Sequence, residues 1–288
     1  MINFLHNFQP ESILLSIGPI TIYWYGFFMM SAILAGLLFI IYLAKRYKIE
    51  TNIIIDLAFW MILFGIIGAR LYELIIDFNY YQNNPLAILK VWQGGLAIHG
   101  AIIAGIITLY FFSKNLSKKI NEKYSNIFWK LTAIITPGLA LGQFIGRWGN
   151  YFNQELFGLP SKAPWAIPID IINRPIAYIS DQYFHPTFLY ESLGNLLIFL
   201  ILFSIHLYIL KKSVFKKTVF IRISALYLFL YSVLRYLLEF LRLDSTLVLG
   251  SMRWPQIISI VIILISIYLF AYSFTIDRRE DKAIDQNN

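Results

Sequence analysis

Cysteine is absent from all 288 residues of the chain. This absence excludes disulfide bonds, iron–sulfur clusters, thiolate metal sites and a cysteine nucleophile. The four histidines are scattered and show no spacing typical of metal ligands: His6, His99, His185 and His206. We therefore expect neither a metal site nor a bound cofactor.

Charged side chains are also scarce. They make up only 14% of the chain, whereas hydrophobic residues make up 58%. A soluble domain carries roughly 25% charged residues, and the long apolar runs indicate an integral membrane protein instead. Basic cytoplasmic loops explain the net charge of +8 better than nucleic-acid binding does, so we expect no nucleic-acid partner.

Seven apolar runs reach about 20 residues, the length that crosses a bilayer. They cover approximately residues 20–43, 53–76, 92–113, 128–148, 187–210, 220–241 and 255–275. The segment before the first run has no Lys or Arg, so it lacks the basic start of a cleaved signal peptide. The pattern predicts an all-α integral membrane protein with seven transmembrane helices.

Basic residues indicate how these helices cross the membrane. They follow spans one, three, five and seven: Lys45, Arg46 and Lys48; Lys114, Lys118, Lys119 and Lys123; Lys211, Lys212, Lys216 and Lys217; Arg278, Arg279 and Lys282. Because cytoplasmic loops are enriched in Lys and Arg, we expect these segments inside the cell. The N-terminus then lies outside, and the C-terminus is cytoplasmic.

The longest outward loop lies between spans four and five. It contains five prolines, which prevent a regular helix: Pro160, Pro164, Pro168, Pro175 and Pro186. We expect a small extracytoplasmic head at about 151–186, inserted in a membrane domain of residues 1–275. Residues 276–288 are predicted to form a polar cytoplasmic tail, and the last ten or so residues are expected to be disordered.

The most polar segment of the membrane domain closes span four. Residues 146–155 read Gly-Arg-Trp-Gly-Asn-Tyr-Phe-Asn-Gln-Glu, which places an arginine, amides and a carboxylate at the membrane edge. Polar groups are costly there, so the segment predicts chemistry on a charged group at a membrane surface. Gly138, Gly142 and Gly146 are spaced for tight helix packing, which would fix Arg147 rigidly.

Other spans carry ionisable residues at a similar depth. The ionisable residues within or beside the spans are Arg70, Glu73, His99, Arg147, Glu155, His185, Glu191, Arg235, Glu239, Arg242 and Asp244. The predicted orientation puts almost all of them in the outer half of the membrane. On span six, the spacing of Tyr231, Arg235, Glu239 and Arg242 predicts one continuous helical face.

Structural roles also explain some of these residues. Arg70 and Glu73 are three residues apart on one helix and are spaced to neutralise each other. An arginine near a helix end, such as Arg242, commonly extends to the lipid headgroups. A lone histidine on an apolar helix, such as His99, is more often a hydrogen-bonded structural residue than a functional one.

Five segments resemble the prolipoprotein diacylglyceryl transferase family. They are Gly146-Arg147-x-Gly149-Asn150-Tyr151-x-Asn153-x-Glu155, Trp24-Tyr25-Gly26, Gly94-Gly95-Leu-Ala-Ile-His99-Gly100, His185-Pro186-Thr187-x-Leu189-Tyr190-Glu191 and Tyr231-x3-Arg235-x3-Glu239-Phe-x-Arg242-x-Asp244. They occur in the family's order and extend over nearly the whole chain. The chain departs from the family at Leu243, where a proline is common, and residues 251–256 are only loosely similar.

The resemblance implies a reaction at the outer face of the bacterial cytoplasmic membrane. The diacylglyceryl group of phosphatidylglycerol moves to the thiol of the lipobox cysteine in a prolipoprotein signal peptide. The products are a thioether and glycerol 1-phosphate, in the first step of lipoprotein maturation. The implied partners are therefore phosphatidylglycerol, other membrane lipid and the prolipoprotein. The thiol comes from the substrate, so the enzyme needs no cysteine.

We assign roles on this basis. Arg147 and Arg235 are expected to bind the lipid phosphate, oriented by Glu155 and Glu239. The remaining expected lipid contacts are Asn150, Asn153, Tyr25, Tyr231, Arg242 and Gly158, the last as a turn over the site. His99 leads as the general base because an unperturbed imidazole suits proton transfer at neutral pH, and Glu191 is its rival.

Two other classes of protein also place polar groups among apolar helices. A polytopic transporter with an outward-facing polar site is the main alternative. However, its charges are expected to continue through the inner half, and no inverted repeat is evident. An intramembrane serine protease lacks support, because the chain has no GxSxG nucleophile elbow.

Overall fold

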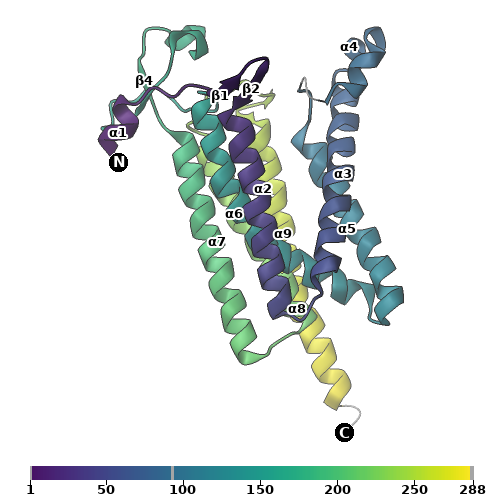
Figure 1. Cartoon of the computed structure of the whole chain (residues 1–288). Helices are drawn as coiled ribbons and strands as arrows, with labels where there is room; N and C mark the ends of the chain where they lie inside the picture. Colours follow the sequence, from purple (N-terminus) through teal and green to yellow (C-terminus); the bar gives the residue numbers. More distant parts are fainter. Residues whose placement is uncertain (1, 92–93, 286–288) are drawn as a thin grey trace. The chain divides into compact units, whose positions relative to one another are not determined.

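The computed structural model describes residues 2–91 and 94–285 (Figure 1). Seven of the described helices are long and apolar enough to cross a membrane: α2 (Trp24–Arg46), α3 (Thr51–Ile76), α5 (Ile98–Ile120), α6 (Tyr124–Phe152), α7 (Thr187–Lys212), α8 (Lys217–Leu238) and α9 (Trp254–Asp285). The predicted fold class is confirmed: the chain is a multi-pass, mainly helical membrane protein. The predicted span 92–113 begins at residues 92–93, which lie outside the described residues.

The chain divides into two compact units, each described by itself. The first contains residues 1–40 and 133–288, and the second contains residues 41–132. In the first unit, α8 packs along α9 and α7. In the second unit, α3 packs along α5. Two short helices lie between them in the chain, α4 (Phe78–Asn83) and η1 (Pro85–Leu89).

The glycine row of α6 packs against α2, as its spacing predicts. A Cβ added at Gly138 would lie 2.9 Å from the carbonyl oxygen of Gly36, and one added at Gly142 would lie 3.3 Å from that of Ala32. Such close backbone approach needs small residues on both helices. This contact between α2 and α6 lies just before Arg147, near the end of α6.

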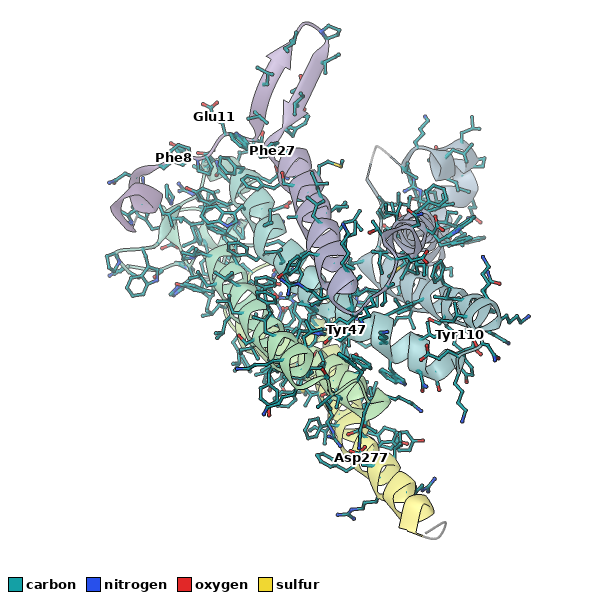
Figure 2. The ribbon with its side chains drawn as sticks, turned by 60° about the horizontal axis from the view of Figure 1, so that its bottom comes forward. Phe8, Glu11, Phe27, Tyr47, Tyr110 and Asp277 are labelled. Carbon is teal, nitrogen blue, oxygen red and sulfur yellow. The ribbon has the colours of Figure 1, made fainter. Side chains whose placement is uncertain are left out.

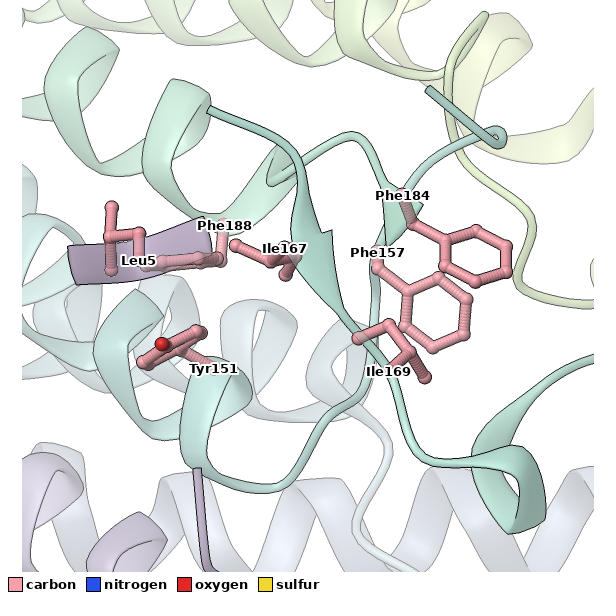
Figure 3. Close-up of a cluster of buried hydrophobic side chains, with 7 residues drawn as sticks. All are labelled: Leu5, Tyr151, Phe157, Ile167, Ile169, Phe184 and Phe188. Atoms are coloured by element: carbon pink, nitrogen blue, oxygen red, sulfur yellow. The ribbon is translucent and has the colours of Figure 1, made fainter. Parts of the chain in front are cut away.

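The segment between α6 and α7 folds into a small head with its own apolar core. It contains the antiparallel pair β3 (Ile167–Pro168) and β4 (Tyr183–Phe184) and the single turns η3 (Ile171–Asn173) and η4 (Ile176–Tyr178). Figure 3 shows the core cluster: Leu5, Tyr151, Phe157, Ile167, Ile169, Phe184 and Phe188.

The N-terminal helix α1 (Ile2–Asn7) also packs on the head, which the sequence did not predict. The His6 ring stacks on Tyr183 at 4.2 Å, and its Nδ1 lies 2.8 Å from the carbonyl oxygen of Ala166. These contacts give His6 a structural role.

The first predicted span began too early. Residues 20–23 form strand β2 (Ile20–Tyr23), which pairs with β1 (Ile13–Ile17), and α2 begins only at Trp24. The hairpin turns at Gly18, whose φ of 57° suits glycine, and β-branched residues on both sides favour strands. The hairpin extends away from the helices of its unit (Figure 2).

The predicted disordered tail is also wrong for most of its length, because α9 continues to Asp285. Residues 286–288 lie outside the described residues. Within α9, Asp277 pairs with Arg222 of α8, and the Arg222 guanidinium lies 4.0 Å from the centre of the Phe274 ring. Arg222 was not among the residues singled out from the sequence, and its charge is satisfied by this pair.

The remaining strands form a short hairpin between α8 and α9, β5 (Val248–Leu249) with β6 (Met252–Arg253). Gly250 makes its turn with a φ of 63°. This hairpin places Arg253 beside the polar end of α8.

Candidate functional site

The signature turns the chain sharply at the end of α6. The helix continues to Phe152, four residues beyond the predicted end. The Glu155 N–H donates to the Asn150 carbonyl at 3.0 Å, and the Gln154 N–H donates to that of Tyr151, also at 3.0 Å. This pair of bonds is a Schellman motif, in which a left-handed residue closes the helix.

Gln154 occupies the left-handed position, with a φ of 51°. Glycine is usual there, because a side chain costs roughly 1–2 kcal/mol in this conformation. Its side-chain nitrogen donates to Asp170 Oδ2 at 2.6 Å and to the Pro10 carbonyl at 2.9 Å, and its oxygen accepts from the Asp170 N–H at 2.7 Å. These bonds offset the cost and attach the head to the signature.

Arg147 is held by two side chains. One guanidinium nitrogen lies 2.6 Å from Glu191 Oε1, and another donates to Asn150 Oδ1 at 3.2 Å. Asn150 in turn donates to Glu155 Oε1 at 2.6 Å. Glu155 therefore acts on Arg147 only through Asn150, and the direct counter-ion of Arg147 is Glu191.

Glu191 is buried between two arginines. Its Oε2 accepts from Arg242 at 3.4 Å, and its Oε1 faces Arg147. The Glu191 side chain is only 2% exposed. A carboxylate in this position is well placed to orient guanidinium groups and poorly placed to receive a proton from a substrate.

The continuous helical face predicted for span six ends early. Helix α8 stops at Leu238, with Glu239 as its C-terminal cap. The chain then turns so that Leu241 accepts a backbone hydrogen bond from Leu159 at 2.8 Å. Arg242 is consequently buried, with a 4% exposed side chain, and does not extend toward lipid headgroups.

Arg235 and Glu239 form an ion pair of 2.8 Å within the last turn of α8. The Glu239 side chain is fully buried, whereas that of Arg235 is 18% exposed. A second guanidinium nitrogen of Arg235, Nη1, is buried and has no hydrogen-bond partner in the described part of the chain. A buried donor without a partner is uncommon in proteins, and it marks Arg235 as a candidate functional residue.

Asp244 completes the polar cluster beyond α8. It accepts a 2.7 Å hydrogen bond from Arg242 Nε. Burial alone would raise the pKa of the Asp244 carboxyl, but the bond from Arg242 and the charges of Arg242, Arg235 and Arg253 lower this pKa below its ordinary value. Asp244 therefore stays ionised and holds the loop after α8.

Sequence reasoning missed Arg253, which reaches Glu239 Oε1 at 2.8 Å. It lies in residues 251–256, where the resemblance was weakest. Its only sequence signal was a basic residue in a loop predicted to face outward, where the positive-inside bias makes one unusual.

Two tyrosines flank Arg147. Tyr25, at the start of α2, packs on Gly149, where an added Cβ would lie 3.1 Å from Tyr25 Cδ2. Tyr231 of α8 lies close enough to Arg147 for their side chains to interact. Asn153 does not join this cluster, but with Tyr25 it lines an opening of about 640 Å³ beside the β1–β2 hairpin.

In the second unit, Arg70 is enclosed by neutral acceptors rather than by Glu73. No ion pair joins Arg70 to Glu73 in the described residues. Instead, Nη1 donates to the Tyr81 hydroxyl at 2.8 Å and to the carbonyls of Gly94 and Gly95 at 2.8 and 2.7 Å. Gly94 and Gly95 have φ values of 92° and 69°, which glycine adopts freely. Arg70 thereby fixes the loop before α5.

His99 lies in the first turn of α5, just after this loop. Its ring lies 5.8 Å from that of Tyr72 on α3. The Ala97 N–H donates to the Ala69 carbonyl at 3.2 Å, so the start of α5 is attached to α3. His99 belongs to the unit of residues 41–132.

Gly158 packs where three segments meet. Its N–H donates to the His185 carbonyl at 2.9 Å, and it forms an isolated antiparallel bridge with Arg242. An added Cβ would lie 2.9 Å from the Leu241 carbonyl oxygen, from His185 Cβ and from Thr187 Cγ2. Glycine is needed at this position because there is no room for a side chain, and not because of the backbone conformation, since its φ is not in the left-handed region.

We therefore expect Gly158→Ala to destabilise the protein by about 1–3 kcal/mol, as overpacking commonly does. Thermal unfolding of the purified protein measures this change. Gly65→Ala is the matched control, because nothing lies within 4 Å of its added Cβ. An unchanged melting temperature for Gly158→Ala would contradict the packing argument.

The cluster around Arg147 and Arg235 suits an anion attached to an apolar group. It gathers four guanidinium groups and three carboxylates at one end of the apolar helices of its unit: Arg147, Arg235, Arg242 and Arg253 with Glu191, Glu239 and Asp244. Guanidinium groups match the paired oxygens of a phosphate. In the described residues, no group of three or more His, Asp or Glu side chains is placed to hold a metal ion.

Comparisons with known proteins agree with this chemistry. A family model described as prolipoprotein diacylglyceryl transferase matches residues 12–272. A phosphatidylglycerol–prolipoprotein diacylglyceryl transferase of Synechococcus elongatus is 44% identical over 255 residues, covering 88% of this chain and 84% of the relative. Proteins of the same name from Nostoc sp. and Synechocystis sp. are each 41% identical, covering 88% and 91% of this chain and 85% and 89% of the relatives. The chain belongs to the prolipoprotein diacylglyceryl transferase family.

Proposed function

We propose that this protein transfers the diacylglyceryl group of phosphatidylglycerol to the thiol of the lipobox cysteine in a prolipoprotein signal peptide. The observation that carries the proposal is the buried cluster of Arg147, Glu191 and Arg242 beside the pair of Arg235 and Glu239. A phosphate with lipid tails fits a cationic cluster at the end of apolar helices, and the relatives are named for this lipid and this acceptor.

The reaction breaks one carbon–oxygen bond and forms one carbon–sulfur bond. The cysteine sulfur attacks the glyceryl carbon next to the phosphate, and the electron pair of the broken bond stays on the phosphate oxygen of glycerol 1-phosphate. The thiol must lose its proton, because the thiolate is the nucleophile. We assign that proton to His99, because histidine is the side chain that most often acts as a general base.

The arginines are proposed to stabilise the departing phosphate. Charge grows on its oxygens as the bond breaks, so contacts that strengthen at that stage raise the rate. The side chains of Arg147 and Arg235 are 22% and 18% exposed, whereas that of Arg242 is only 4% exposed.

Neighbouring groups then position the lipid and these arginines. Asn150 holds Arg147, and Tyr25 and Tyr231 flank it. Asn153 is assigned to the glycerol oxygens from its place in the opening beside Tyr25. Glu155 supports Asn150, Arg242 steadies Glu191, and Gly158 permits the turn that carries Arg242.

We further propose that the protein resides in the bacterial cytoplasmic membrane with this cluster toward the extracytoplasmic side. The Lys and Arg residues after spans one, three, five and seven support this orientation. The signature closes α6, whose other end follows one of these basic segments. The head at 151–186 then lies outside, where it can meet an exported polypeptide.

A direct assay tests the proposed function. The purified protein is incubated with phosphatidylglycerol and a lipobox peptide, and glycerol phosphate release and peptide mass are followed together. We expect equimolar release of glycerol phosphate and gain of one diacylglyceryl group. A peptide with serine in place of the cysteine is the control and should stay unmodified. An intact thiol peptide without glycerol phosphate release would refute the proposal.

A further inference from the structure

Two buried carboxylates in the first unit are each shared by two guanidinium groups. The pairs are Arg147 with Arg242 on Glu191, and Arg235 with Arg253 on Glu239. In each pair the first arginine, Arg147 or Arg235, is a proposed phosphate contact. The second, Arg242 or Arg253, lies in the segment after α8. The roles assigned under the proposed function do not include Arg253.

The Arg253 side chain is 22% exposed, but protein groups hold its guanidinium. Its Nε lies 2.8 Å from Glu239 Oε1, and its two terminal nitrogens donate to the backbone carbonyls of Arg242 and Asp244. Its backbone N–H donates to Gln256 Oε1 at 3.0 Å, in the first turn of α9. Every guanidinium nitrogen of Arg253 therefore contacts protein, which favours a structural and electrostatic task over ligand binding.

Arg235 is held differently. One of its terminal nitrogens pairs with Glu239 Oε2 at 2.8 Å, and Nη1 is buried without a hydrogen-bond partner in the described residues. If Arg235 alone neutralised Glu239, little net charge would remain for a ligand. Because Arg253 pairs with the same carboxylate, the two arginines and Glu239 together carry one net positive charge, which can attract a phosphate.

We propose that Arg253 is a positioning residue of this site, which shares Glu239 with Arg235 and fixes the 242–244 loop, so that the trio of Arg235, Glu239 and Arg253 keeps a net positive charge for the phosphate of the lipid. The inference rests on the proposed function for the identity of the ligand. It adds a residue that lies outside the five segments quoted from the sequence.

A double-mutant cycle separates this electrostatic task from a purely structural one. The full-length protein is prepared as wild type, Arg253→Gln, Glu239→Gln and the double variant. Equilibrium binding of phosphatidylglycerol is measured by native mass spectrometry in detergent. Thermal unfolding of each variant checks that it is folded. If Arg253→Gln is not folded, Arg253→Met, which also removes the charge, takes its place.

We expect Arg253→Gln to weaken phosphatidylglycerol binding about ten-fold, the scale of close charge couplings. In the Glu239→Gln background, the same substitution should change binding less than about three-fold, since the carboxylate it balances is gone. Arg222→Gln, which breaks another arginine–carboxylate pair between α8 and α9, should leave lipid binding unchanged.

An equal loss in both backgrounds would overturn the inference, because a loop held only through its carbonyls is indifferent to the charge of Glu239. Unchanged binding in Arg253→Gln would overturn it as well. The readout is independent of catalysis: if the wild type binds phosphatidylglycerol but does not modify the peptide, the proposed function fails while the cycle remains interpretable.

Discussion

Arg147→Ala is expected to lower the rate of diacylglyceryl transfer at least about a hundred-fold, the usual cost of removing a group that stabilises developing charge. The substitution removes the guanidinium that lies 2.6 Å from Glu191 and leaves that carboxylate with Arg242 alone. Release of glycerol phosphate measures the rate, and membrane extraction measures insertion. Insertion should be intact, because the apolar face of α6 is unchanged.

Arg174→Ala is the matched control for this experiment. Arg174 lies in the head and donates to the backbone carbonyls of Ile169 and Ile179, away from the ion-paired cluster. Its removal should leave the rate within a few-fold of the wild type. Near-normal transfer by Arg147→Ala would rule out the assignment of Arg147 to the phosphate.

The second large effect is expected from His99→Gln. Glutamine keeps a polar side chain of similar length but cannot accept a proton at neutral pH, and general-base catalysis contributes about 10²–10⁴-fold. Single-turnover transfer to the lipobox peptide measures the loss. Because His6 stacks on Tyr183 within the head, His6→Gln is the control and should retain most of the activity.

Substantial turnover by His99→Gln would exclude His99 as the essential base. The geometry makes Glu191 a weak replacement, since its carboxylate already faces Arg147 and Arg242. The position of Glu191 instead favours a role in holding the two arginines.

The helices could be predicted from the sequence because a single physical rule governs them. About 20 consecutive apolar residues have few alternatives to a membrane-spanning helix, and all seven were found. Their ends depend on turn geometry, which hydropathy does not record. The first helix begins later than predicted, because residues 20–23 pair with β1. Helix α8 ends earlier than the predicted face of span six, because the chain turns after Leu238.

Which residues contact each other in the site was harder to predict than which residues belong to it. The signature identified Arg147, but spacing could not show that Glu191 on another helix is its counter-ion. Spacing favoured Glu73 as the partner of Arg70, whereas the structure supplies carbonyls of a distant loop. Such contacts arise from tertiary packing between segments, and a single sequence carries almost no trace of them.

The core of the head also sets a constraint on biosynthesis. His6 contacts Ala166 across a sequence separation of 160 residues, and Leu5 packs in the same cluster as Phe188 at the start of α7. At a synthesis rate of about 5–20 residues per second, the N-terminal segment waits on the order of ten seconds for these partners. The head is therefore completed late, after four spans and the start of the fifth have left the ribosome.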